Sequence, residues 1–156
     1  MALVTQALWF ARDMQAALRF YTALIPGSAM GPVWTVAADT PSGPPGAVEV
    51  CDFTLGDQRY RAMQAGTTEA FNNTFSIAIA CKDQAELDRM WDALAEGGTV
   101  LQCGWLQDRW GLSWQIMPDA LIRLMADPDQ DRAARVAQAM MSMVKFDIAA
   151  LERAAG

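Results

Sequence analysis

The sequence contains no histidine, so the commonest general base and the commonest transition-metal ligand in proteins are both missing. Its three cysteines, Cys51, Cys81 and Cys103, are an odd number and show no CxxC spacing. We interpret them as reduced thiols rather than as a disulfide or a metal site. A Cys–His nucleophile is excluded because the thiols have no imidazole partner.

Long apolar runs and clustered basic residues are missing as well. No run approaches the ~18–20 apolar residues of a membrane-spanning helix, and the first residues lack the pattern of a signal peptide. A net charge of −6 without a basic stripe gives little attraction to phosphate backbones. We therefore expect a cytoplasmic protein that binds neither nucleic acid nor a membrane.

The chain does contain an internal repeat with a spacing of seventy residues. Residues 6–13 and 76–83 are each an apolar run, then a basic residue, then an aspartate that opens an amphipathic helix. We expect Asp13 and Asp83 to be the N-caps of these helices, and Asp83 to form a capping box with Glu86, in which each side chain accepts from the other residue's backbone N–H. Further strands are predicted over roughly 29–37, 48–55, 59–65, 99–103, 105–109 and 112–117, with an irregular proline-rich loop over 39–46.

The pattern changes to helix after Pro118. A short helix is predicted over 119–126, a second with Asp127 as its cap and Pro128 at its first position, and a last one opened by Asp147. Apolar residues are expected to line one face of the second helix: Ala133, Val136, Ala137, Met140, Met141 and Val144. Hydrophobic residues make up 53% of a chain of 156 residues, which suits one compact domain with a sizeable core.

Three motifs carry a family resemblance: Leu8-Trp9-Phe10, the thirteen-residue run Cys103–Gln115 (CGWLQDRWGLSWQ), and the closing run 147–154 (DIAALERA). With them the chain resembles the vicinal oxygen chelate (glyoxalase/bleomycin-resistance) superfamily, and within it the PhnB-like branch. The resemblance implies an α+β glyoxalase-like fold, in which two βαβββ modules form a cupped mixed sheet followed by C-terminal helices. It places a single domain over 1–156, with modules at 1–66 and 74–118 and a helical extension at 119–156.

The resemblance also implies where a site lies. In metal-dependent members, the first and last strands of each module place His or Glu at the floor of the cup, and the mapped positions here are Gln6, Gln64, Ser76 and Gln115. Amides and a hydroxyl carry no charge to offset the dehydration of a divalent ion. We therefore predict no metal site and no cofactor, and a hydrogen-bonding floor in their place.

Strand alternation extends this floor to neighbouring side chains. Residues two positions along a strand share a face, so Leu8, Phe10, Ser113 and Met117 are expected to line the cup, together with Ala78 and Ala80. Trp9 and Trp114 are then expected to face the helices. Such a wall suits a small, partly apolar ligand. The alternative, in which the polar residues satisfy one another inside a packed sheet, stays open. Asp108, at the hairpin tip, is interpreted as a turn residue.

Three functional hypotheses follow. The first is a homodimeric protein that binds a small organic ligand without an essential metal. The second is an enzyme of the same superfamily, a lyase, dioxygenase or isomerase that holds metal weakly or uses a carboxylate not yet placed. The third is a dimeric scaffold with a filled pocket. Some relatives are labelled as ubiquinone-pathway methyltransferases, but no glycine-rich loop follows the first strand to hold S-adenosylmethionine.

Overall fold

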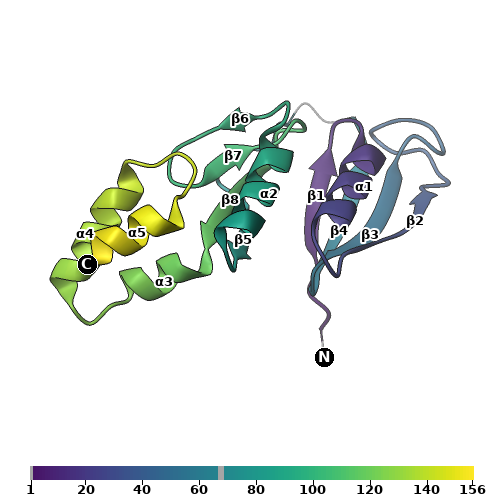
Figure 1. Cartoon of the computed structure of the whole chain (residues 1–156). Helices are drawn as coiled ribbons and strands as arrows, with labels where there is room; N and C mark the ends of the chain where they lie inside the picture. Colours follow the sequence, from purple (N-terminus) through teal and green to yellow (C-terminus); the bar gives the residue numbers. More distant parts are fainter. Residues whose placement is uncertain (1, 67–68) are drawn as a thin grey trace. The chain divides into compact units, whose positions relative to one another are not determined.

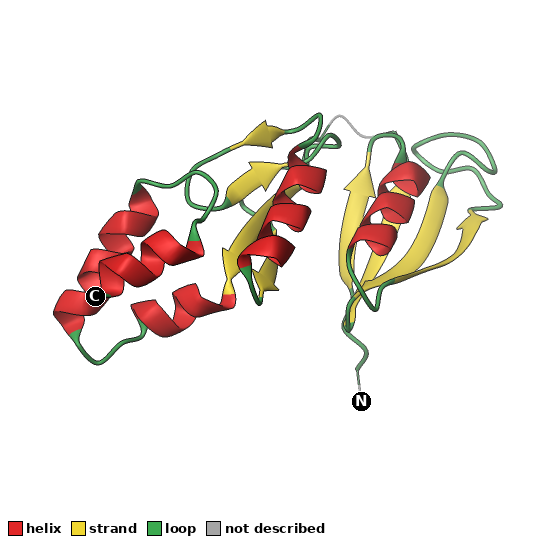
Figure 2. Ribbon diagram, viewed as in Figure 1, coloured by secondary structure: helices red, strands yellow, loops and turns green. Residues whose placement is uncertain are grey.

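The computed structural model of the chain describes residues 2–66 and 69–156. The chain divides into two compact units, Met1–Ala70 and Phe71–Gly156. Each unit contains one four-stranded mixed sheet and one helix packed on it (Figures 1 and 2). In the described part of the chain, no helix is both long enough and apolar enough to cross a membrane.

The first unit has the order strand, helix and three strands. Its elements are β1 (Gln6–Phe10), α1 (Met14–Leu24), β2 (Ala29–Thr35), β3 (Glu49–Leu55) and β4 (Gln58–Gln64). The strands lie in the order β1-β4-β3-β2, in which β1 is parallel to β4 and the other neighbours are antiparallel. The α1 helix covers one face of this sheet (Figure 2).

The core of the first unit lies between α1 and the covered face of the sheet. The helix buries Met14, Ala17, Leu18 and Tyr21 at helical spacing. The strands contribute buried residues at every second position: Leu8, Phe10, Cys51, Phe53, Leu55, Tyr60 and Ala62. The predicted facing of β1 was therefore wrong, because Leu8 and Phe10 are 4% and 1% exposed whereas Trp9 is 45% exposed.

The second unit repeats the same topology, which confirms the predicted βαβββ repeat. Its elements are β5 (Ile77–Cys81), α2 (Gln84–Ala95), β6 (Thr99–Val100), β7 (Trp105–Gln107) and β8 (Ser113–Pro118). The strand order is β5-β8-β7-β6, and β5 is parallel to β8. Glu86 N–H donates to Asp83 Oδ1 at 2.8 Å, so Asp83 caps α2 as expected. The Glu86 carboxylate accepts from Lys82 N–H, one residue before the expected capping-box partner.

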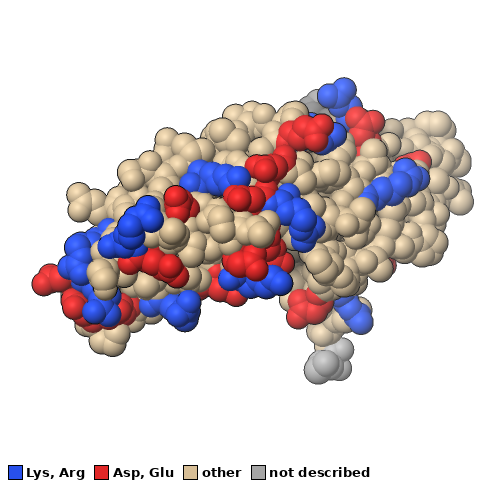
Figure 3. Space-filling view, viewed as in Figure 1, with Lys and Arg blue, Asp and Glu red and all other residues tan. Residues whose placement is uncertain are grey.

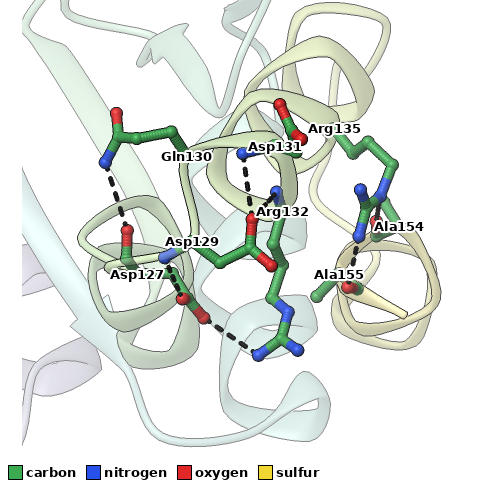
Figure 4. Close-up of polar contacts among 8 residues, drawn as sticks. All are labelled: Asp127, Asp129, Gln130, Asp131, Arg132, Arg135, Ala154 and Ala155. Carbon is green, nitrogen blue, oxygen red and sulfur yellow. Dashed lines mark hydrogen bonds and ion pairs between the residues drawn. The ribbon is translucent and has the colours of Figure 1, made fainter.

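Three further helices complete the second unit: α3 (Asp119–Met125), α4 (Gln130–Met141) and α5 (Ile148–Ala155). Asp147 caps α5 as predicted, because it accepts from Ala150 N–H at 2.9 Å. The predicted start of α4 was wrong. Asp129, rather than Asp127, caps this helix by accepting from two backbone N–H groups, and Asp127 instead pairs with Arg132 (Figure 4).

The outer surface of these helices is mixed in charge and partly apolar. Lys and Arg side chains are interspersed with Asp and Glu over this part of the second unit (Figure 3). Val136 is buried, but Met141 is 67% exposed and Val144 is 39% exposed, so these two do not belong to a buried helix face as predicted.

The segment before α5 attaches the helices to the sheet. Cys103 N–H and Gly104 N–H donate to the carbonyls of Met143 and Val144 at 2.9 and 2.8 Å. The Phe146 ring is 2% exposed and lies over Gly104, where a Cβ atom would meet it at 2.4 Å. Only glycine therefore fits position 104.

The two units differ by one residue between the first strand and the helix. Three residues separate Phe10 from Met14, whereas two separate Cys81 from Gln84. The helices therefore match at a spacing of seventy and the first strands, β1 and β5, at seventy-one. The additional residue leaves Asp13 in the left-handed region, with φ 58° and no side-chain cap. The prediction that Asp13 caps α1 was wrong.

Candidate functional site

The sheet face of the second unit opposite α2 holds two of the predicted site residues in contact. Gln115 Nε2, on β8, donates to Ser76 Oγ at 2.8 Å, just before β5. The parallel register pairs Ala78 with Gln115 and Ala80 with Met117, so these small side chains lie beside the glutamine and the methionine. Sequence reasoning placed this half of the site on one face, and the structure does the same.

Ser113 belongs to the same face and has a partner that the sequence did not reveal. Its Oγ donates to Asn73 Oδ1 at 2.7 Å, and Gln107 Nε2 donates to the same oxygen at 3.3 Å. Asn73 precedes β5 in a polar connection that offers no periodicity to interpret. It could be found only once β5 and β8 were paired.

Trp114 faces the other way, as predicted, and is completely buried. Its indole Nε1 donates to Asp108 Oδ2 at 2.9 Å, and Asp108 Oδ1 accepts from Trp110 N–H and Leu112 N–H. The Asp108 carboxylate is therefore a buried turn residue that organises the β7–β8 hairpin. The carboxylate oxygens accept hydrogen bonds from residues of the hairpin, and this confirms the interpretation of Asp108 as a turn residue.

In the first unit, the predicted residues lie on the face that α1 covers. Gln6, Leu8 and Phe10 pair with Tyr60, Ala62 and Gln64 and share that face with them. Gln64 Oε1 accepts from Met14 N–H at 2.9 Å and so supplies the cap that Asp13 does not. Because β1 follows the spacing of seventy-one, the predicted β1 residues were displaced by one position and turned to the wrong face.

The uncovered face of the first unit carries charge. Arg61 donates to both carboxylate oxygens of Asp52, from Nε at 2.6 Å and from Nη2 at 2.9 Å. This bidentate hydrogen bond lowers the pKa of Asp52. Trp9 lies on the same face of β1, beside Met63 of β4.

The equivalent positions of the two units show whether a divalent metal fits. When β1 is matched with β5 and β4 with β8 by their registers, Thr5 and Arg61 are the counterparts of Ser76 and Gln115. In the first unit, a hydroxyl and a guanidinium are poor ligands, because the guanidinium repels a cation, and in the second unit a hydroxyl and an amide carry no charge to offset its dehydration. Nowhere in residues 2–66 or 69–156 do three or more His, Cys, Asp or Glu residues gather as a metal cluster.

The three thiols are free, as predicted. Burial raises the pKa of Cys81 to about 12, with smaller contributions from nearby carboxylates. Burial, and to a smaller extent the negative charge of Asp52, raises the pKa of Cys51. Both thiols stay protonated at neutral pH, so neither is an activated nucleophile.

The sequence pattern of a protein family described as 3-demethylubiquinone-9 3-methyltransferase matches residues 2–117. The chain belongs to this family. The match spans both βαβββ units and ends within β8, so α3, α4 and α5 lie beyond it. No curated protein matches the chain.

Solved structures agree with the family assignment and with the glyoxalase-like fold. A PhnB protein of Bacillus cereus, titled a putative 3-demethylubiquinone-9 3-methyltransferase, is 26% identical with a TM-score of 0.65, and the match covers 74% of this chain and 98% of that one. A Pseudomonas aeruginosa protein is 22% identical with a TM-score of 0.55, covering 76% and 100%. The fosfomycin resistance protein FosX of Mesorhizobium loti is 17% identical with a TM-score of 0.50, covering 72% and 87%, and shows the fold alone.

The family description implies a methyl donor, but the residues after the first strands do not fit one. The connections after β1 and β5, residues 11–13 and 82–83, contain no glycine. A glycine-rich loop of the dinucleotide-binding type needs glycine there so that the backbone can approach the ligand closely. We therefore derive no methyl transfer for this chain.

Proposed function

We propose that the chain binds a small organic molecule on the uncovered sheet face of its second unit, without an essential metal or cofactor. Ser76 and Gln115 are the polar anchor of this proposal, and Ser113 and Met117 are its neighbours. The observation that carries it is the Gln115–Ser76 hydrogen bond on a sheet face that α2 does not cover.

The hydrogen-bonding capacity of Gln115 supports a polar ligand. A glutamine amide offers two donor hydrogens and an acceptor oxygen, and Ser76 uses one donor. Within the described residues, no group donates to Gln115 Oε1. A ligand hydroxyl or amine that donates to this oxygen satisfies it, and it does so without displacing the contact with Ser76.

The neighbouring side chains suit an apolar ligand body. Met117 and Trp105 are half-buried on the face that carries Gln115, and Trp105 lies directly across from Gln115 in the β7–β8 ladder. Ala78 and Ala80 are small and exposed, so they leave room above β5. A few polar groups set among apolar side chains are typical of small-molecule sites.

We also propose that two copies associate as a homodimer and that the protein acts in the cytoplasm away from nucleic acid and membranes. The net charge of −6 supports the last part, because anionic polymers and anionic lipid surfaces repel it. Light scattering after size exclusion measures the mass, and a single 17.0 kDa species would contradict the dimer.

The experiment that tests the binding site is a thermal-shift screen with small polar compounds on the wild type and on Gln115→Ala. We expect the variant to lose ligand-dependent stabilisation while its own Tm stays within about 2 °C, because Gln115 is a half-exposed residue outside the core. Gln102→Ala is the matched control, because Gln102 is exposed outside the strands.

Two outcomes contradict the proposal. If Gln115→Ala unfolds readily without any ligand, the glutamine is structural. If native mass spectrometry of protein purified without chelator shows one divalent ion per chain, with turnover that chelation removes, the enzyme hypothesis takes its place.

A further inference from the structure

The residues that correspond to the Ser76–Gln115 site lie around a hollow in the first unit. Matching β1 with β5 and β4 with β8 makes Thr5, Arg59 and Arg61 the counterparts of Ser76, Ser113 and Gln115. All three line one hollow of about 400 Å³. This volume falls within the range of pockets that hold small ligands.

Most of the remaining lining is apolar. Leu3, Ala29 and Met30 contribute to the wall, and Leu3 is 75% exposed. Contact between water and an exposed leucine is unfavourable. An apolar group bound in the hollow reduces this contact. The wall therefore suits a hydrocarbon body.

The charged groups of the hollow leave one positive charge uncompensated. Arg61 is held by Asp52 through two hydrogen bonds, so these two charges offset each other. Arg59 is exposed, and within the described residues no hydrogen bond or ion pair engages it. A guanidinium with free donors at the rim of an apolar hollow is suited to a carboxylate.

The geometry points to a second ligand site in this hollow, which binds an organic monoanion: a carboxylate, placed at Arg59 and Arg61, that carries a short apolar chain. A dianion such as a phosphate monoester fits less well, because the Asp52 carboxylate in the lining repels its second negative charge. The net charge of −6 adds to this repulsion. This inference stands on the first unit alone and does not depend on the proposed role of Gln115.

Octanoate and its neutral analogue octanamide are the probes, titrated into the full chain by calorimetry. We expect saturable one-to-one binding of octanoate, about tenfold tighter than that of octanamide, because a charge-assisted hydrogen bond contributes about that much. Arg59→Gln removes the preference. Arg12→Gln, at a side chain 87% exposed outside the hollow, keeps it. Asp52→Asn strengthens octanoate binding, because it frees Arg61 from its partner.

Amide chemical shifts locate the site, and we expect octanoate to move the signals of Thr5, Met30 and Arg59. The inference is overturned if octanoate and octanamide bind equally, if neither binds, or if Arg59→Gln keeps the preference. Gln115→Ala keeps octanoate binding if the inference is right. Loss of octanoate binding in Gln115→Ala with retention in Arg59→Gln also overturns it. A failure of the Gln115 screen alone leaves this result unaffected.

Discussion

The two units share one topology and place different chemistry at matching positions. In the first unit, the antiparallel pair Asp52–Arg61 on the uncovered face is an ion pair. In the second unit, the matching pair is Trp105–Gln115, which is neutral. The hydroxyl before the first strand is kept in both, as Thr5 and Ser76. The shared frame therefore fixes where side chains meet, and the residue types decide which ligand each face suits.

The units also stabilise matching turns by different means. The β3–β4 hairpin of the first unit turns at Gly56 and Asp57, and Asp57 is exposed. The β7–β8 hairpin of the second unit turns around Asp108, whose buried carboxylate accepts three hydrogen bonds. An exposed turn needs only residues that can adopt its backbone conformation. A buried turn also needs a hydrogen-bond partner for each of its polar groups.

The largest expected effect separates these two turns. Asp108→Ala leaves the Trp114 indole N–H and two backbone N–H groups without acceptors in a buried place, and we expect it to lower the free energy of unfolding by about 3 kcal/mol or more. Asp57→Ala should change it by no more than about 0.5 kcal/mol. Urea denaturation measures both. Equal small effects would show that the Asp108 hydrogen bonds do not hold the hairpin.

A second comparison concerns two glycines with positive φ. At Gly104, φ is 77° and an added Cβ would lie 2.7 Å from the Ile116 carbonyl oxygen as well as against Phe146. At Gly56, φ is 56° and nothing lies within 4 Å. We expect Gly104→Ala to cost about 2–4 kcal/mol and Gly56→Ala about 1 kcal/mol, which is the left-handed penalty alone. In Gly104→Ala, earlier proteolysis within α3–α5 than in the wild type would show that the helices have lost their attachment. A cleavage pattern unchanged from the wild type contradicts that role for Gly104.

Much of this architecture could be predicted from the sequence because periodicity and turn residues report it directly. The helices, the hairpins and the cap at Asp147 follow from local pattern. The facing of β1 could not be predicted, because it depends on a connection one residue longer than that of β5. A strand has a period of two, so that single residue turned Gln6, Leu8 and Phe10 to the other face. Asn73 was missed because only strand pairing brings it to Ser113.

The smallest expected effect tests the additional residue itself. Asp13 has φ 58° and caps nothing, so Asp13→Gly relieves the left-handed strain and should raise the free energy of unfolding by about 0.5–1 kcal/mol. Asp83, its counterpart, accepts from Glu86 N–H, and Asp83→Ala should lower it by about 1 kcal/mol. Thermal melts at matched protein concentration show whether each variant is more or less stable than the wild type. If both variants are destabilised to the same extent, the α1 connection does not differ from that of α2, and the displaced register of β1 must have another cause.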